Sequence, residues 1–223
     1  MPRIASAGAI LLLAAAAAAA QEKLQYNVNW PTGLSLGEVT LSAASVGAEW
    51  DLKLAIDASI PGFVIRDSFT SRVSNAFCSA AFEKDSTHGA RRSVEKSVFD
   101  KSRGVVVRET LKGGGKSETP FTGCARDALA FLYHLRQELE AGRIPPPQTV
   151  FFGAAYQAKL QFRGAERVKV GEERIEADHI TATLKGPASD LTFDLFFARD
   201  SGRTPVLVRV PFSMGVFSME LQR

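Results

Sequence analysis

The run Gly113-Gly114-Gly115-Lys116-Ser117 is similar to the end of a phosphate-binding loop. That motif needs another glycine five residues before Gly115, where this chain has Thr110, and a helix that begins at the lysine. Here Pro120 follows shortly, and the flanking segments alternate as strands do. We therefore interpret the run as the flexible tip of a hairpin.

Side chains that could hold a metal or act as nucleophiles are few. His88 falls in a turn, His134 in a helical segment and His179 beside Asp178 on a strand, so no two histidines share an element at metal-ligand spacing. No serine occupies a Gly-x-Ser-x-Gly turn. We therefore expect no metal, no cofactor and no catalytic residue, with a hydrolase assembled from distant segments as the third choice of function.

Residues 1–20 have the pattern of a secretory signal peptide. Arg3 precedes an uncharged stretch centred on Leu11-Leu12-Leu13, and small residues lead up to Gln21. At about 17 residues and rich in alanine, this stretch is at the lower limit for a membrane span. We predict cleavage near Ala20, export to the periplasm or the medium, and no transmembrane span in the remaining chain.

The charge and cysteine content fit an exported domain. Without residues 1–20, which hold Arg3 and no acid, the formal net charge falls from +3 to +2, so no nucleic-acid partner is expected. Cys78 and Cys124 form an even pair, which in an oxidising compartment favours a disulfide with Cα atoms less than about 7 Å apart. Two separately buried thiols are the alternative.

Apolar and polar residues alternate along most of the chain. Leu24, Tyr26, Val28 and Trp30 share one face of a predicted strand. Phe193 and Phe197 lie on the apolar face of another, at 189–199, which forms a hairpin with 204–211. The spacing becomes helical only near 125–141, where Gly142 and Pro145-Pro146-Pro147 end the helix.

These patterns predict a mainly β protein in which residues 21–223 form a single domain. About 12 antiparallel strands in one sheet must curl into a half-barrel or a barrel to bury their apolar faces. Only one main helix is available to cover the concave face, so part of that face is free to hold a ligand. The candidate ligand-binding residues are Tyr133, Arg136, Phe193 and Phe197.

The chain resembles the bacterial exported family known as domain of unknown function 3108. The resemblance rests on a helix signature, on two residues that follow it, and on a C-terminal group. These residues are Asp127-Ala128-Leu129, Tyr133, Leu135-Arg136, Gly153, Tyr156, Asp200, Arg203-Thr204-Pro205-Val206, Gly215 and Glu220-Leu221. The resemblance spans about residues 22–222. It implies an exported, β-rich protein similar in general shape to the open half-barrels of periplasmic lipoprotein carriers.

The charged residues of the family signature have two interpretations. Arg136 could pair with Glu220 or Asp127 and fasten the helix to the sheet, which makes these residues structural, like Cys78 and Cys124. Alternatively, the Arg136 guanidinium could anchor the head group of an anionic lipid.

The sequence therefore favours a periplasmic binding or carrier protein, not an enzyme, for an apolar or amphipathic lipid-like ligand. An envelope structural or assembly factor that binds another protein is the alternative.

Overall fold

The structure is a computed structural model that describes residues 21–223 except 61, 112, 188 and 214. The predicted signal peptide, residues 1–20, lies outside the described residues. Within them, no helix is long and apolar enough to cross a membrane.

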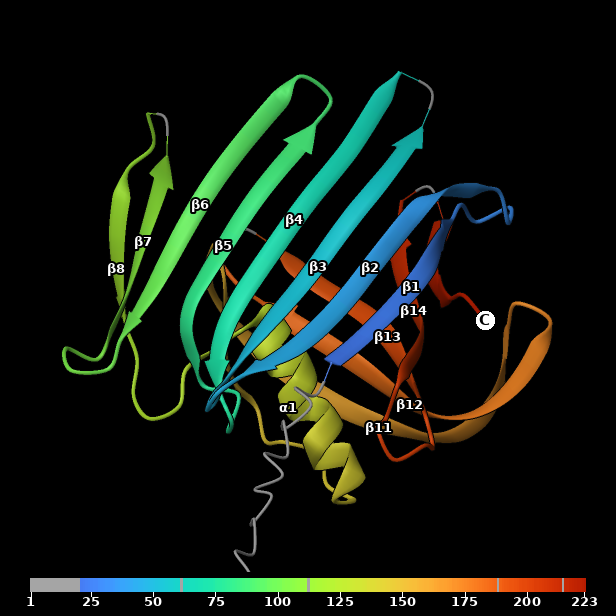
Figure 1. The fold of residues 1–223 in the computed structure, drawn as a ribbon. Helices are drawn as coiled ribbons and strands as arrows, with labels where there is room; N and C mark the ends of the chain where they lie inside the picture. The colour runs from blue at the N-terminus through green and yellow to red at the C-terminus, as the bar shows by residue number, and fades with distance from the viewer. Residues whose placement is uncertain (1–20, 61, 112, 188, 214) are drawn as a thin grey trace, which may run out of the picture.

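One sheet of fifteen strands forms most of the described chain, with the helix α1 (Ala128–Glu140) against it (Figure 1). We call β1–β8 the first arm and β9–β15 the second arm. The first arm comprises β1 (Gln21–Asn29), β2 (Ser35–Val46), β3 (Glu49–Ile60), β4 (Phe63–Ser74), β5 (Ser79–His88), β6 (Arg91–Asp100), β7 (Val105–Leu111) and β8 (Lys116–Pro120). The second arm comprises β9 (Arg126–Asp127), β10 (Gln148–Phe152), β11 (Ala154–Val170), β12 (Glu173–Lys185), β13 (Asp190–Ala198), β14 (Pro205–Phe212) and β15 (Gly215–Leu221).

The strand order places the two ends of the described chain in the middle of the sheet. The order is β8-β7-β6-β5-β4-β3-β2-β1-β15-β14-β13-β12-β11-β10-β9, and β1 pairs antiparallel with β15, with Tyr26 opposite Leu221. The edge strands β8 and β9 are therefore neighbours in sequence, joined by residues 121–125. A flat sheet of this width could not be spanned by five residues, so the sheet must curl.

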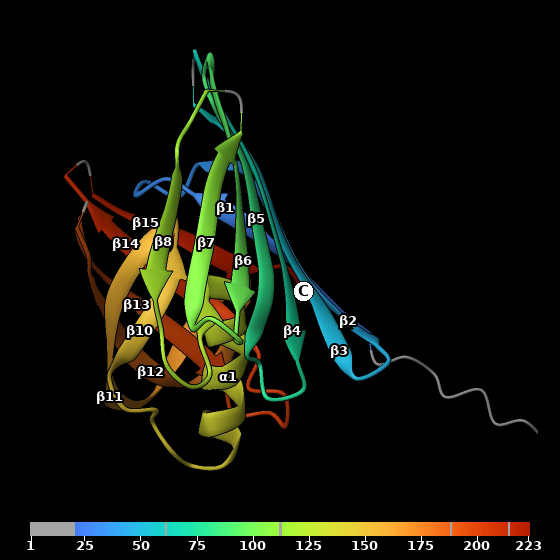
Figure 2. The ribbon, with the colours of Figure 1, turned by 90° about the vertical axis from the view of Figure 1, so that its left-hand side faces the viewer.

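The two arms face each other, and α1 lies between them toward one end (Figure 2). One side of the helix, through Tyr133, belongs to the same apolar cluster as Leu52 of β3. The other side, through Leu135, packs on Ile180 of β12 and Phe197 of β13. The helix therefore holds the arms together at this end by burying apolar surface on both.

Aromatic side chains cover the gap between the sheet edges. Phe121, in the connection from β8 to β9, contacts Phe99 of β6 and Phe151 of β10, with ring centroids 6.3 and 6.5 Å apart. Phe99 and Phe151 also meet edge to face at 5.6 Å. These contacts join the first arm to the second without strand pairing.

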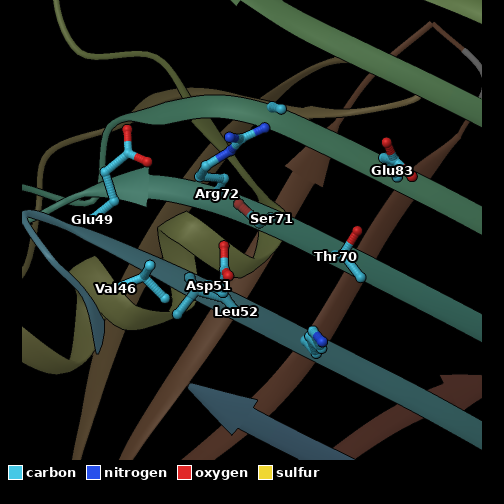
Figure 3. A pocket seen from close by; sticks show the side chains of 10 residues that line it. Val46, Glu49, Asp51, Leu52, Thr70, Ser71, Arg72 and Glu83 are labelled. Atoms are coloured by element: carbon cyan, nitrogen blue, oxygen red, sulfur yellow. The ribbon is translucent and has the colours of Figure 1, made fainter. Parts of the chain in front are cut away.

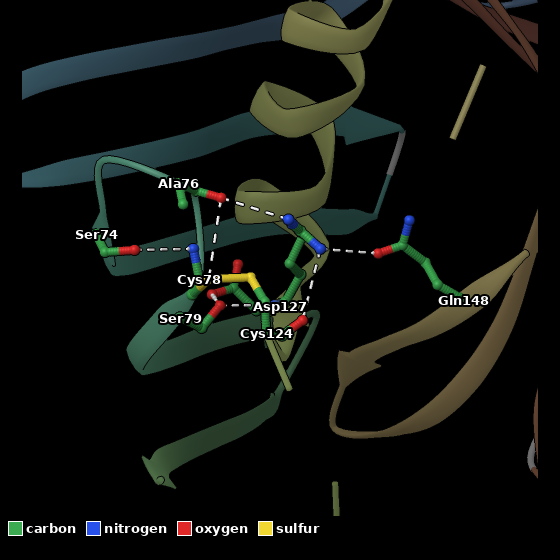
Figure 4. The surroundings of a disulfide bond; sticks show 8 residues. Ser74, Ala76, Cys78, Ser79, Cys124, Asp127 and Gln148 are labelled. Atoms are coloured by element: carbon green, nitrogen blue, oxygen red, sulfur yellow. Dashed lines mark hydrogen bonds between the residues drawn. A yellow bond between two sulfur atoms is a disulfide. The ribbon is translucent and has the colours of Figure 1, made fainter. Parts of the chain in front are cut away.

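The disulfide Cys78–Cys124 forms, with the Cα atoms 5.1 Å apart, as the sequence predicted (Figure 4). It links the β4–β5 turn to the residue two positions before β9. The residues that follow the two cysteines are also joined, because the amide of Ser79 donates a hydrogen bond to the carbonyl of Ala125 at 2.9 Å. The edge of the second arm is thus tied to the start of β5 covalently and by backbone bonding.

Asp127 is the N-cap of α1 and is completely buried. Its Oδ1 accepts hydrogen bonds from the amides of Leu129 and Ala130, and its Oδ2 accepts from the hydroxyls of Ser71 and Ser79. Burial raises the pKa of Asp127 above the usual range for an aspartate, against the lowering effect of these four hydrogen bonds. The carboxylate thus fastens the start of the helix to β4 and β5.

Several sequence predictions need correction. The sheet has 15 strands instead of about 12, partly because the short polar strand β8 and the two-residue strand β9 carry no clear alternation. The helix spans Ala128–Glu140, shorter than 125–141, since Asp127 caps it from outside. Segments 155–163 and 166–170 form one strand, β11, with a register shift between Phe162 and Gly164. The predicted end at Gly142 is confirmed, with φ of 70° just after the C-cap.

The double variant Cys78→Ser, Cys124→Ser tests the covalent link. For a sequence separation of 46 residues, the chain-entropy model expects the free energy of unfolding to fall by about 4 kcal/mol. Urea unfolding of the oxidised protein and of the variant measures the difference. Equal midpoints would show that the aromatic and helix contacts hold the edges together without the disulfide.

Replacing Asp127 tests the cap. Asp127→Ala removes the helix cap and leaves the hydroxyls of Ser71 and Ser79 without their acceptor, so we expect a loss of about 3 kcal/mol. Asp127→Asn keeps an oxygen for the helix amides and serves as the matched control, with a smaller loss. Denaturant unfolding distinguishes the two, and an equal loss in both variants would contradict the role of the cap oxygen.

Candidate functional site

An apolar pocket of about 420 Å³ opens between the arms, away from α1. It is built by β1 to β4 of the first arm and by β14 and β15 of the second. The surface that the lining residues expose to it is entirely apolar. The lining includes Val28, Trp30, Leu36, Val39, Ile56, Ala58, Ile65, Val208, Val210, Phe217 and Met219. It lies where the helix no longer fills the space between the arms.

Strand register brings these side chains onto one face. Val28 of β1 is opposite Met219 of β15, and Met219 is opposite Val208 of β14. On the other side, Val39 of β2 is opposite Ile56 of β3. Directly paired residues point to the same face of a sheet, so period-two alternation in six strands produces a continuous apolar lining.

Aromatic rings form the outer part of the pocket. Trp30 meets Phe217 edge to face at 4.8 Å, and Phe212 meets Phe217 at 5.3 Å. Phe63 also lines the pocket, and both Phe63 and Phe212 remain exposed, at 41% and 56%. The entrance is therefore aromatic and partly open to solvent.

A larger, more polar hollow of about 900 Å³ adjoins this pocket and shares Phe63 with it. Lys84, His88 and Arg91 line it. The His88 ring lies 3.0 Å from a carboxylate oxygen of Asp67, and the Lys84 ammonium lies over the Phe152 ring at 5.3 Å. An apolar pocket beside a hollow with cationic side chains offers separate environments for the two ends of an amphipathic molecule.

Two of the predicted ligand-binding residues, Tyr133 and Arg136, lie together at another place. The Arg136 guanidinium donates to both carboxylate oxygens of Glu22 at 2.7 Å, and the Tyr133 hydroxyl donates to Glu22 at 3.0 Å. Arg136 also donates to the carbonyl of Gly202. The predicted pairing of Arg136 with Glu220 or Asp127 is thus wrong, because the carboxylate that pairs with the guanidinium is that of Glu22, near the start of β1.

The Glu22 carboxylate is held ionised by this arrangement. Burial alone would raise the pKa of Glu22, but the hydrogen bonds and positive charge of Arg136 hold it below the usual range. Burial, and next the charge of Glu22, raise the pKa of Tyr133 well above that of a free tyrosine, so its hydroxyl stays protonated as a donor. Tyr133 and Arg136 line a hollow of about 250 Å³ with Trp50 and Phe77.

The other two predicted ligand-binding residues lie under the helix. Phe197 is completely buried beside Leu135 and Leu139, and Phe193 packs against the same cluster. Neither lines the apolar pocket, so the four predicted residues belong to two separate places. Glu220, predicted as structural, accepts a hydrogen bond from the hydroxyl of Ser218 at 2.9 Å.

The convex surface carries mixed charge. A hollow of about 420 Å³ on β3, β4 and β5 is lined by charged side chains, which include Asp51, Lys53, Arg72 and Glu83 (Figure 3). The His179 side chain is 22% exposed, and its ring lies between the carboxylates of Glu166 and Asp194. Among the described residues, no group of three or more His, Cys, Asp and Glu side chains could hold a metal ion.

Most residues that line the apolar pocket carry no signal in the sequence that marks them as a site. Val28 and Trp30 were recognised as one strand face, but Val210, Phe212 and Phe217 were not singled out. The available signal was the alternation of Val208, Val210 and Phe212 along β14. Without the strand order, nothing indicated that this face lies opposite β2 and β3.

Comparisons with known proteins agree with this architecture. A beta-barrel-like protein of domain of unknown function DUF1849 from Brucella abortus, known from its crystal structure, matches with a TM-score of 0.61. The two share 8% identity over 90% of this chain and 95% of that chain, which shows a common fold alone. No curated protein matches the sequence. A family model described as "Protein of unknown function (DUF3108)" matches residues 25–222, so this chain belongs to the DUF3108 family.

Proposed function

We propose that this protein binds or carries an apolar or amphipathic, lipid-like molecule in the apolar pocket between the arms. The observation that carries the proposal is the pocket itself, whose exposed lining has no polar surface. At about 420 Å³ its volume lies within the usual range for small-molecule sites. A pocket that exposes no polar surface favours a hydrocarbon chain over a polar metabolite, since a polar ligand would lose its hydrogen bonds to water there.

The proposed location is the periplasm or the extracellular medium. Residues 1–20 have the pattern of a signal peptide, and the Cys78–Cys124 disulfide suits an oxidising compartment. A soluble carrier is useful in such a compartment, because a lipid cannot cross an aqueous space alone without exposing its chain to water.

Arg136 has a structural role in this proposal. Its side chain is 8% exposed, and its guanidinium donates hydrogen bonds to Glu22 and to the carbonyl of Gly202. A ligand head group would have to displace Glu22 to reach it. The adjoining hollow with Lys84 and Arg91 is the better place for a polar end of the ligand.

Binding of cis-parinaric acid, a fatty acid that fluoresces in apolar sites, tests the pocket directly. Val210→Glu places a carboxylate in the apolar lining, and we expect the Kd to rise at least about tenfold because that charge would be buried without a partner. Val98→Glu is the matched control, since Val98 is 55% exposed and does not line the pocket.

Oleate should displace the probe from the unmodified protein and from the control. The proposal fails if the unmodified protein gives no saturable fluorescence. It also fails if the two glutamate variants bind the probe equally well. Circular dichroism of both variants checks that a loss of binding is not a loss of fold.

The Glu22–Arg136 pair has a pH signature. Glu22→Gln leaves a mostly buried guanidinium without its counter-charge, so we expect a loss of about 2 kcal/mol at pH 7. The pKa of Glu22 is lowered on folding, so its stabilisation is present above the unfolded pKa and fades as the pH falls through the lower folded value. In urea unfolding, the free energies of unfolding of Glu22→Gln and of the unmodified protein should therefore differ most near neutral pH. The difference should shrink below about pH 4.

A difference that stays constant between pH 7 and pH 3 would contradict the ion pair. Because Glu22 lies outside the apolar pocket, probe binding by folded Glu22→Gln should be unchanged.

A further inference from the structure

Exposed apolar side chains gather at one end of the molecule. Among the described residues, nine large apolar side chains are exposed, and five of these lie at the ends of the β1–β2, β3–β4 and β14–β15 hairpins. These five are Leu34, Phe63, Val64, Phe212 and Val216. The turns of these hairpins lie at the end of the molecule away from α1 (Figure 2). We call this group the apolar rim.

The apolar rim borders the apolar pocket. Phe63 and Phe212 belong to both the rim and the pocket lining. The β14–β15 and β1–β2 turns touch, because a Cβ on Gly215 would lie only 2.7 Å from Pro31. The exposed surface of the rim is thus continuous with the interior of the pocket.

Positive charge accompanies the apolar rim. Four arginines and no Asp or Glu occur in the sequence of the four neighbouring hairpin ends, which are residues 29–36, 60–66, 86–92 and 209–216. The arginines are Arg66, Arg91, Arg92 and Arg209. Arg66 and Arg92 pair with Asp57 and Asp85. Asp57 lies directly opposite Arg66, whereas Arg91 and Arg92 lie nearer the β5–β6 turn than Asp85 does, so the outermost charges at that turn are cationic.

We propose that this end of the protein docks on the surface of an anionic lipid bilayer. The apolar rim enters the boundary between head groups and acyl chains, and the arginines contact the lipid phosphates. Docking places the mouth of the apolar pocket against the acyl chains, where a lipid can enter or leave without crossing water. The role of the docked state rests on the proposed function, but docking itself is a separate property.

A membrane fits the apolar rim better than a protein partner does. The rim side chains lie on separate hairpin turns beside an open pocket, whereas protein interfaces usually present a packed apolar centre. A rim of apolar residues with flanking arginines is the pattern expected of a surface that contacts lipid head groups and chains together.

Vesicle flotation of residues 21–223 tests the proposal. The vesicles contain phosphatidylcholine alone or with about a third phosphatidylglycerol, a composition that supplies surface negative charge. The double variant Leu34→Ser, Val216→Ser removes two rim side chains, 66% and 48% exposed, that do not line the apolar pocket. The matched control is Val46→Ser, Val98→Ser, which removes two side chains 57% and 55% exposed elsewhere on the sheet.

We expect the unmodified protein and the control to float with the anionic vesicles, more weakly as salt is raised. The rim variant should lose at least about tenfold in vesicle affinity, corresponding to about 1.4 kcal/mol. Its affinity for cis-parinaric acid should be unchanged, because its pocket lining is intact.

Three results would overturn docking. The unmodified protein could fail to bind either kind of vesicle, or the rim and control variants could float equally. Light scattering could instead show that the rim variant abolishes a dimer, which would make a second copy of the chain the partner. If the probe still enters the pocket in any of these cases, the proposed function stands without docking. If the unmodified protein does not bind the probe, the proposed function is refuted, whatever the vesicles show.

Discussion

The pairing of β1 with β15 is the constraint on which the rest of the architecture depends. It places the two ends of the described chain at the centre of the sheet and leaves β8 and β9, which are adjacent in sequence, as its edges. The five residues between them can connect these edges only if the sheet curls. The disulfide, the Asp127 cap and the Phe99–Phe121–Phe151 contacts then hold that curl at one end. The apolar pocket is a consequence, because α1 fills only part of the enclosed space.

Much of this fold could be predicted from local patterns. Alternation at Leu24 to Trp30 and a change to helical spacing before Gly142 revealed the element types, since each element exposes one face to the core. The disulfide was predictable from the even number of cysteines and from the signal-peptide pattern of residues 1–20. The short strand β9 could not be predicted, because it consists of two residues that pair in parallel with β10 and depends on tertiary contacts.

The candidate site was harder to predict because it depends on which strands are neighbours. Phe193 and Phe197 were correctly placed on an apolar face, but nothing in the sequence shows that α1 covers that face and leaves the surface of β14 and β15 open. Arg136 was correctly singled out as a partner in an ion pair. Its partner, Glu22, is 114 residues away and reaches it only because β1 lies beside β15 at the centre of the sheet.

The central position of β1 also limits when folding can finish. Among the described strands, β1 is synthesised first, but its partner along one edge, β15, is synthesised last. Until then β1 has an unpaired edge, Tyr26 lacks the carbonyl of Pro205 that accepts from its hydroxyl, and the two arms cannot close around the helix. Completion of the sheet is therefore a late, long-range step of the kind that slows folding. During synthesis the open strand edges need protection from pairing with other chains.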